Sequence, residues 1–276
     1  KGNTMIAALH SCGLIGIDGY PVTVEVDISR GIPSFDIVGL PDAAVKESRE
    51  RVRAAIKNTG LEFPSKRITV NLAPADIKKA GAAYDLPIAI GILLASEQIS
   101  CQTLNDYVFS GELSLNGELH SINGCLSISD FARRTGKQYV VVPKENAAEA
   151  AVIEGVSVLA AQTLAQVLQH LNGTQPLEPV PSTGHTLFAA GQADGLDFAD
   201  VKGQQTAKYA LEIAAAGGHN CLMIGPPGSG KTMLAQRLPS ILPDLTLKEA
   251  LEVTKIHSVA GELSPDTPLL TKRPFR

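Results

Sequence analysis

The chain has 276 residues with 24 Lys or Arg and 28 Asp or Glu, which gives a formal net charge of −4. Its 44% hydrophobic and 19% charged residues are typical of a globular protein with ample material for a core, and the length indicates two domains. The mild acidity and the absence of Trp argue against a strongly basic nucleic-acid coat and against a site built mainly from aromatic side chains.

The cysteine pattern indicates a reducing compartment. Cys12, Cys101, Cys125 and Cys221 are scattered, without a C-x-x-C pair, so neither a disulfide framework nor a structural zinc site is expected. No run of about 18 apolar residues is present, and the first residues lack the pattern of a secretory signal. We therefore expect a cytoplasmic protein with no membrane partner.

The segment up to about residue 170 alternates short strands with helices. Val22, Val24 and Val26 alternate with polar residues, as in a half-buried strand. Asp42 is a candidate N-cap for a helix that continues to Thr59. The run 85–96 is apolar almost all round, which predicts a buried helix. A short apolar run lies at 35–39, further strands are expected at 67–72, 107–110 and 138–142, and further helices at 127–135 and 147–153.

A Pro- and Gly-rich stretch divides the chain. Residues 172–184 read NGTQPLEPVPSTG, which is typical of a semi-stiff linker, and periodicity returns only near Phe198. We therefore expect an N-terminal domain over 1–171, a linker over 172–194 and a second domain over 195–276. In the second domain, helices are predicted at 204–216 and 231–238 and a short apolar strand at 220–224.

The strongest chemical signal is GPPGSGKT at 225–232, a complete G-x-x-x-x-G-K-[ST] phosphate loop between the expected strand and helix. Its glycines let backbone N–H groups turn toward phosphate oxygens, Lys231 would reach the β- and γ-phosphates, and the Thr232 hydroxyl would bind Mg²⁺. Lys231 and Thr232 are therefore the expected catalytic residues, and Thr232 is the expected metal ligand. The predicted nucleotide-binding residues are Gly225, Pro226, Pro227, Gly228, Ser229, Gly230, Lys231, Thr232 and Met233.

The residues after Thr232 supply no apolar run that ends in Asp-Glu. Hydrolysis needs a strand-borne Asp for the metal and a carboxylate to orient water, whereas Asp244, Glu249 and Glu252 lie in a polar helical stretch. The expectation is a fragment that carries the phosphate loop, stops within a domain at Arg276 and has no turnover of its own.

Several stretches together resemble the N-terminal half of the ComM/YifB-type magnesium-chelatase-like AAA+ ATPases. They are PVTVEV (21–26), GIPSF (31–35), VGLP (38–41), RERVRAAI (49–56), NLAPAD (71–76), YDLPIA (84–89), AAAGGHN (214–220) and IHSVAG (256–261). The resemblance implies an α/β protein, with an α+β N-terminal domain of the Lon-protease-like fold followed by the start of a P-loop AAA+ parallel-sheet domain. It places residues 197–204 beside an adenine, and 273–276 shortly before the remaining catalytic segments.

The same resemblance implies ATP and Mg²⁺ as cofactors, assembly with itself into hexameric rings, and an ATP-driven motor on branched or single-stranded DNA. The parent would be a DNA branch-migration helicase in recombination or natural transformation. Two alternatives stay open: the motor subunit of a metal chelatase, and an N-terminal domain that serves only as a docking module.

Lon-type peptidases use a Ser nucleophile and a Lys base. In the matching stretches Asp85 stands about where the Ser should be, and Ile128 lies in the later stretch where an amine is needed. A Ser–Lys dyad is therefore absent and no protease activity is expected; Asp85 is interpreted as an N-cap.

A basic run lies on the helix that begins near Asp42. Arg49, Arg51, Arg53 and Lys57 are interleaved with acidic residues, which favours a solvated helix face over a DNA-binding patch.

Overall fold

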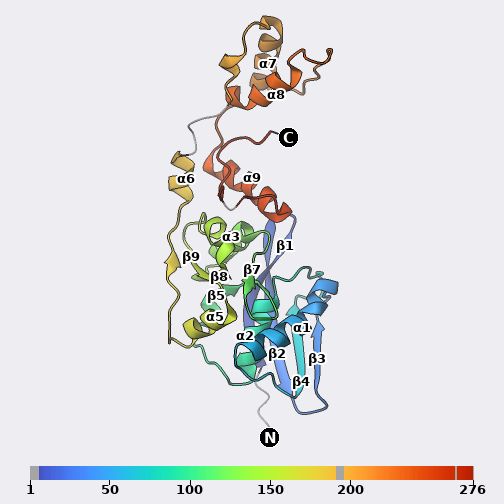
Figure 1. The fold of residues 1–276 in the computed structure, drawn as a ribbon, viewed down its shortest axis with the longest axis vertical. Coiled ribbons are helices and arrows are strands. Elements are labelled where there is room, and N and C mark those ends of the chain that lie inside the picture. Colours follow the sequence, from blue (N-terminus) through green and yellow to red (C-terminus); the bar gives the residue numbers. More distant parts are fainter. Residues whose placement is uncertain (1–5, 191–195, 265, 276) are drawn as a thin grey trace. The chain divides into compact units, whose positions relative to one another are not determined.

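The first sheet of the protein is built around a long hairpin. The computed structural model describes residues 6–190, 196–264 and 266–275. Strands β1 (Ile6–Ile15) and β2 (Asp18–Ser29) pair antiparallel, and the sheet has the order β1-β2-β4-β3 (Figure 1). Strand β4 (Arg67–Ala73) is antiparallel to β2 and parallel to the edge strand β3 (Ser34–Val38).

A second, mainly parallel sheet has the order β10-β9-β8-β5. Its strands are β5 (Tyr107–Phe109), β8 (Tyr139–Pro143), β9 (Ser157–Ala161) and β10 (Pro179–Val180), of which β10 runs antiparallel to β9. A small hairpin of β6 (Glu112–Leu113) and β7 (Leu119–His120) follows β5.

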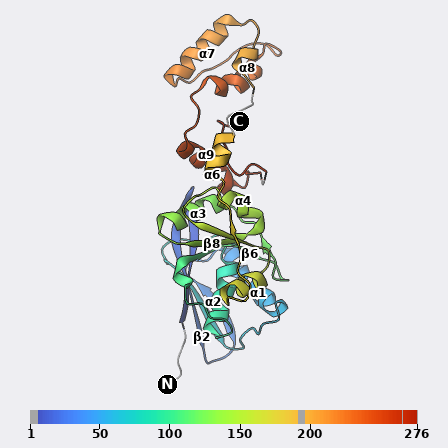
Figure 2. The same ribbon diagram turned by 90° about the vertical axis from the view of Figure 1, so that its left-hand side faces the viewer.

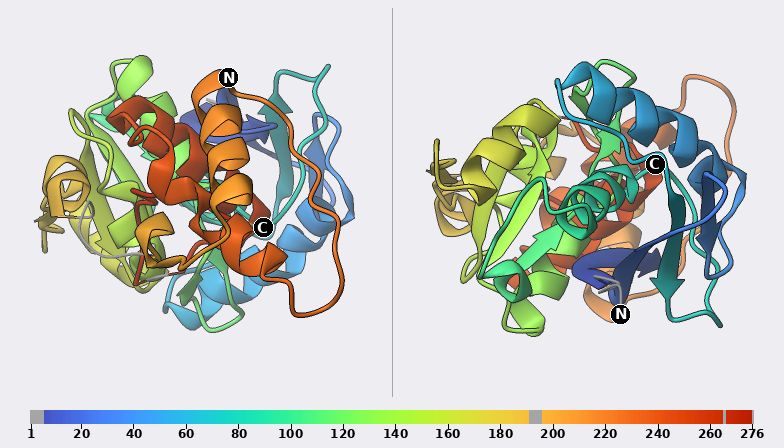
Figure 3. Two further views of the ribbon diagram at one scale, coloured as in Figure 1. Left: turned by 90° about the horizontal axis from the view of Figure 1, so that it is seen from above. Right: turned by 90° about the horizontal axis from the view of Figure 1, so that it is seen from below.

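Helices cover these sheets and connect their strands (Figure 2). They are α1 (Ala43–Asn58), α2 (Asp85–Ala95), α3 (Cys125–Arg134), α4 (Ala147–Ala150) and α5 (Leu164–Leu171), with short 3-10 turns η1 (Leu104–Asp106) and η2 (Lys144–Asn146). Helices α1 and α2 pack against each other, and α2 also contacts β1 and β2 (Figure 3).

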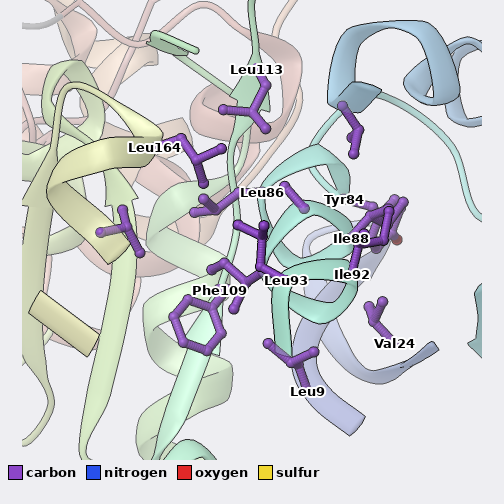
Figure 4. Close-up of a cluster of buried hydrophobic side chains, with 14 of the residues drawn as sticks. Leu9, Val24, Tyr84, Leu86, Ile88, Ile92, Leu93, Phe109, Leu113 and Leu164 are labelled. Carbon is purple, nitrogen blue, oxygen red and sulfur yellow. The ribbon is translucent and has the colours of Figure 1, made fainter. Parts of the chain in front are cut away.

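Helix α2 lies between the two sheets. Every one of its residues is buried, as the continuous apolar run predicts. Leu86 and Leu93 point toward Phe109 on β5, whereas Ile88 and Ile92 point the opposite way, toward Val24 on β2 (Figure 4). Because both faces of this helix are covered by apolar side chains, it forms the centre of one core that both sheets share.

Helix α1 begins and ends as predicted. The Asp42 side chain caps it by accepting a hydrogen bond from the Val45 amide at 2.8 Å, and Thr59 follows its last turn. The alternation of β2 is also confirmed, since Val22, Val24 and Val26 are buried. Strands β1 and β9 and helix α5 were not predicted.

The segment expected as a linker contacts the second sheet and the helices beside it. Pro179 and Val180 pair with β9, the Leu177 amide donates to Nδ1 of His170 at 3.0 Å, and the Ser182 hydroxyl donates to the Ala151 carbonyl at 3.1 Å. A helix, α6 (Gly184–Ala190), follows, and residues 191–195 of the expected linker lie outside the described residues. Proline residues here are compatible with strand β10 because it is an edge strand.

The chain divides into two units. The first comprises Lys1–Gly184 with Thr254–Pro268, and the second His185–Val253 with Leu269–Arg276. This differs from the sequence-based boundaries, which placed all of 195–276 in one domain.

The second unit has a small core of Phe198, Val201, Leu211 and Leu234. Its elements are the 3-10 turns η3 (Phe198–Asp200) and η4 (Leu238–Ile241) and the helices α7 (Gln205–Gly217), α8 (Lys231–Arg237) and the first part of α9 (Leu247–Ala260).

The predicted strand at 220–224 does not form. Leu222 is 85% and Ile224 87% exposed, and the described residues of the second unit contain no strand. A strand needs neighbours for its backbone N–H and C=O groups. The apolar run therefore stays irregular, and the described residues of this domain do not form the expected parallel sheet. In the described part of the chain, no helix is long and apolar enough to cross a membrane.

Candidate functional site: the phosphate loop and the former peptidase position

The phosphate loop connects the irregular run 220–224 to helix α8. Lys231 is the first residue of α8, and Gly230 precedes it with a φ of +84°. A Cβ at residue 230 would lie 2.8 Å from Nε2 of Gln204, and one at residue 225 would lie 3.0 Å from the Ser229 hydroxyl. Glycine is therefore favoured at 230 by its backbone conformation, whereas a side chain at 225 would require the Ser229 hydroxyl to shift.

Lys231 folds back into this loop. Its Nζ donates to the carbonyl oxygens of Gly225 at 2.8 Å and Pro226 at 2.9 Å, and it lies 3.2 Å from the Ser229 hydroxyl. The ammonium group is thus surrounded by the loop backbone, where it could instead hold the oxygens of a phosphate group.

Thr232 and Met233 follow in the first turn of α8, and both are exposed. The Thr232 hydroxyl is available as one ligand, while the described residues hold no group of three His, Cys, Asp or Glu able to bind a metal ion. This set fits Mg²⁺ bound mainly by phosphate oxygens and water, because Mg²⁺ in nucleotide sites commonly takes only one or two protein ligands.

Residues 197–204 reach the loop through Gln204, a contact that the sequence did not predict. The Gln204 Nε2 donates to the Ser229 carbonyl at 3.2 Å, and its backbone adopts a φ of +53°. Upstream, Asp197 and Asp200 form a capping box around η3. The sequence signal for this conformation was the Gly203-Gln204 pair, which stands directly before a predicted helix.

Asp85 occupies the position expected for a peptidase nucleophile, but it is not an N-cap. The cap of α2 is Tyr84, and Asp85 is the first helical residue, with a fully buried side chain. Arg51 on α1 donates from Nε to Oδ2 of Asp85 at 2.6 Å and from Nη2 to Oδ1 at 3.2 Å. Ser48 and the Leu113 amide also donate to this carboxylate.

This arrangement determines the charge of the carboxyl group. Burial raises the pKa of Asp85, and the hydrogen bonds from Arg51, Ser48 and Leu113 oppose that shift. The Asp85 hydrogen bond raises the pKa of Arg51. Because every one of these groups donates a hydrogen bond, together they satisfy an ionised carboxylate, and Arg51 and Asp85 form an ion pair.

Arg51 therefore differs from the other basic residues of α1. Its side chain is only 20% exposed and faces inward, whereas the sequence placed it on a solvated face. Arg49 and Lys57 are exposed, and Arg53 lies over the Phe63 ring at 5.1 Å. Arg51 is thus a core ion-pair partner and does not belong to any basic patch.

Ile128, in the stretch where a peptidase base would stand, is buried in the core beside Cys125 and Phe131. An isoleucine carries no titratable group, and Asp85 is held by its four donors. Neither residue can supply the hydroxyl or the amine of a Ser–Lys dyad.

Two family models match the chain. The model of subunit ChlI of Mg-chelatase matches residues 24–146, and that of magnesium chelatase, subunit ChlI, matches 197–276. Lon protease 2 of Bacillus subtilis is 29% identical over 137 residues, which cover 49% of this chain and 24% of that protein. This more distant likeness is consistent with the mixed α/β fold of the first unit.

Two other relatives match nearly the whole chain. YifB of Escherichia coli is 46% identical over 272 residues, covering 98% of this chain and 52% of that protein. The competence protein ComM of Haemophilus influenzae is 44% identical over 274 residues, covering 98% of this chain and 53% of that protein. The chain thus spans about half the length of these relatives. It belongs to the ComM/YifB-type magnesium-chelatase-like proteins of the AAA+ class.

Proposed function

We propose that the second unit binds ATP with Mg²⁺ through residues 225–233, and that the protein works as part of an ATP-driven motor. The observation that supports this most directly is the position of Lys231, whose ammonium group lies inside the loop on the Gly225 and Pro226 carbonyls. When bound, the nucleotide would supply the phosphate charge that this ammonium group neutralises. Family membership supports nucleotide use in general.

Each loop residue has a separate role in this proposal. Lys231 binds and orients the β- and γ-phosphates, Thr232 contributes its hydroxyl to Mg²⁺, and Gln204 holds the loop through the Ser229 carbonyl. The described residues offer no acidic cluster for the metal. We therefore expect this chain to bind nucleotide weakly and to show no turnover.

Nucleotide binding is tested with a fluorescent ATP analogue and Mg²⁺. Lys231→Ala should weaken binding at least about tenfold, because it removes charge-assisted hydrogen bonds worth roughly 1.5–3 kcal/mol. Lys248→Ala, which changes an exposed Lys on α9, is the matched control and should bind as the unchanged chain does. Equal binding by both variants would contradict the proposal. Steady ATP hydrolysis that depends on Lys231 would overturn the expected lack of turnover.

For the whole protein we propose assembly into hexameric rings that use ATP to move along branched or single-stranded DNA. The support is the match to the competence protein ComM. The alternative of a metal-chelatase motor is supported by the Mg-chelatase subunit matches. ATP hydrolysis by a protein of the relatives' full length, measured with branched, single-stranded, duplex and no DNA, separates the two: only a DNA motor should be stimulated.

We also propose that the first unit has no peptidase activity. Casein and unstructured peptides should remain intact during incubation with the chain, because Asp85 and Ile128 supply neither a hydroxyl nucleophile nor an amine base. Gel electrophoresis and mass spectrometry of the substrates provide the measurement. Cleavage activity that remains with the chain through purification and is lost in Asp85→Ala would contradict the proposal that the first unit has no peptidase activity.

A further inference from the structure

Two carboxylates of the first unit, the buried Asp130 and the partly buried Glu149, contact a segment that follows the phosphate loop in the sequence. We define the docking surface as Asn123, Gly124, Asp130 and Glu149, which lie before α3, on α3 and on α4. We infer that this surface is a receptor for residues 254–260 of the same chain, so that the first unit anchors the helix that emerges from the P-loop segment. This inference does not depend on nucleotide binding.

The first anchor is an ion pair. Lys255 Nζ donates to Oδ2 of Asp130 at 2.7 Å, and Lys255 is only 9% exposed. Arg133 and Arg134, at 2.7 and 3.2 Å, hold the same carboxylate from one turn further along α3. Burial by itself would raise the pKa of Asp130, but the hydrogen bonds from Lys255 and Arg133 outweigh it and lower that pKa. Asp130 is therefore ionised at neutral pH and compensates the buried ammonium group.

The second anchor joins α9 to Glu149 on α4 and to Gly124, directly before α3. The Ser258 hydroxyl donates to Glu149 Oε1, and the same oxygen accepts the Leu126 amide at 2.8 Å. The Gly124 amide donates to the Ser258 carbonyl at 3.2 Å. Ser258 is buried, so both its hydroxyl and its carbonyl are satisfied by the docking surface.

The two anchors share one helix face. Lys255 and Ser258 are three residues apart and therefore neighbours on α9, whereas Glu252 and Ile256 are exposed. Gly261, directly after the helix, has a φ of +72°, and a Cβ there would lie 2.9 Å from Nδ2 of Asn123. The segment thus meets the surface through a Lys, a Ser and a close backbone approach, each with a defined partner.

This contact explains why Thr254–Pro268 belongs to the first unit. The chain leaves that unit after Gly184 and returns to it at Thr254, so the segment with the phosphate loop is inserted between two parts of the first unit. The first unit, which lacks a peptidase dyad, would then serve to hold both ends of the inserted segment.

Hydrogen–deuterium exchange on the whole chain tests the inference. A helix of 14 residues is only marginally stable by itself in water, so slow exchange of the 254–260 amides requires docking. Lys255→Met should speed their exchange at least about tenfold, because it leaves Asp130 with one fewer buried partner. Lys248→Met, on the exposed part of the same helix, is the matched control and should leave these amides unchanged.

Two further variants distinguish loss of docking from loss of folding. Asp130→Asn should speed exchange over 254–260, and adding Lys255→Met to it should have little further effect, because both changes remove one interaction. If the α2 amides also lose protection in Lys255→Met, that variant has unfolded the first unit, and the milder Ser258→Ala is used in its place. In Ser258→Ala we expect faster exchange over 254–260 and unchanged exchange of the α2 amides. Fast exchange of 254–260 in the unchanged chain, or equal effects of the Lys255 or Ser258 variant and the Lys248 control, would overturn the inference.

Discussion

Replacing Arg51 by Met should lower the free energy of unfolding by about 3–5 kcal/mol, the largest effect that we expect from a single substitution. The change leaves the fully buried Asp85 carboxylate without its cation and without the two hydrogen bonds that Arg51 donates. Urea unfolding followed by circular dichroism measures the loss. Arg49→Met, on the same helix and exposed, should change the free energy of unfolding by no more than about 0.5 kcal/mol.

A double variant separates the ion pair from mere packing. Arg51→Met combined with Asp85→Leu removes both charges and should recover part of the stability lost in Arg51→Met. Recovery should be incomplete, because the Ser48 hydroxyl and the Leu113 amide lose their acceptor. If Arg51→Met and Arg49→Met unfold at the same urea concentration, the ion pair does not stabilise the core as we argue.

The second large effect that we expect is unfolding in two steps. The second unit has a small core of Phe198, Val201, Leu211 and Leu234 and exposes Leu222 and Ile224. Its core is therefore much poorer than that of the first unit, and it should melt at a lower temperature. Calorimetry should resolve two transitions, whereas a single cooperative transition would show that the units stabilise each other.

Limited proteolysis should agree with that order. The sequence predicts that a protease first cuts the chain between about Gly173 and Asp194. Residues 177–183 are held by hydrogen bonds and strand pairing, so we expect the first cut in the part of this range that follows Gly184. The protease-resistant product should retain a peptide that contains 254–268, bound without a covalent link. Native mass spectrometry detects that peptide. Its absence from the resistant product, or a first cut before residue 177, would contradict this expectation.

Local sequence signals by themselves determined much of this protein. The Asp42 cap predicted where α1 begins, the alternation of valines predicted β2, and the continuous apolar run predicted that α2 is buried on all sides. The phosphate loop was equally visible, because its chemistry depends on residue types at fixed short spacings. Each of these signals lies within one segment, so no knowledge of distant residues was required.

Contacts between distant residues decided the rest. Asp85 is a partner of Arg51, which lies 34 residues away, and Lys255 binds Asp130 across 125 residues. The 220–224 run has the composition of a strand but no neighbour to pair with in the described residues, whereas Pro179 and Val180 form a strand because β9 lies beside them. Whether a charged residue is buried in an ion pair, or an apolar run becomes a strand, depends on the partner that the fold brings beside it. The spacing of residues along the chain does not contain that information.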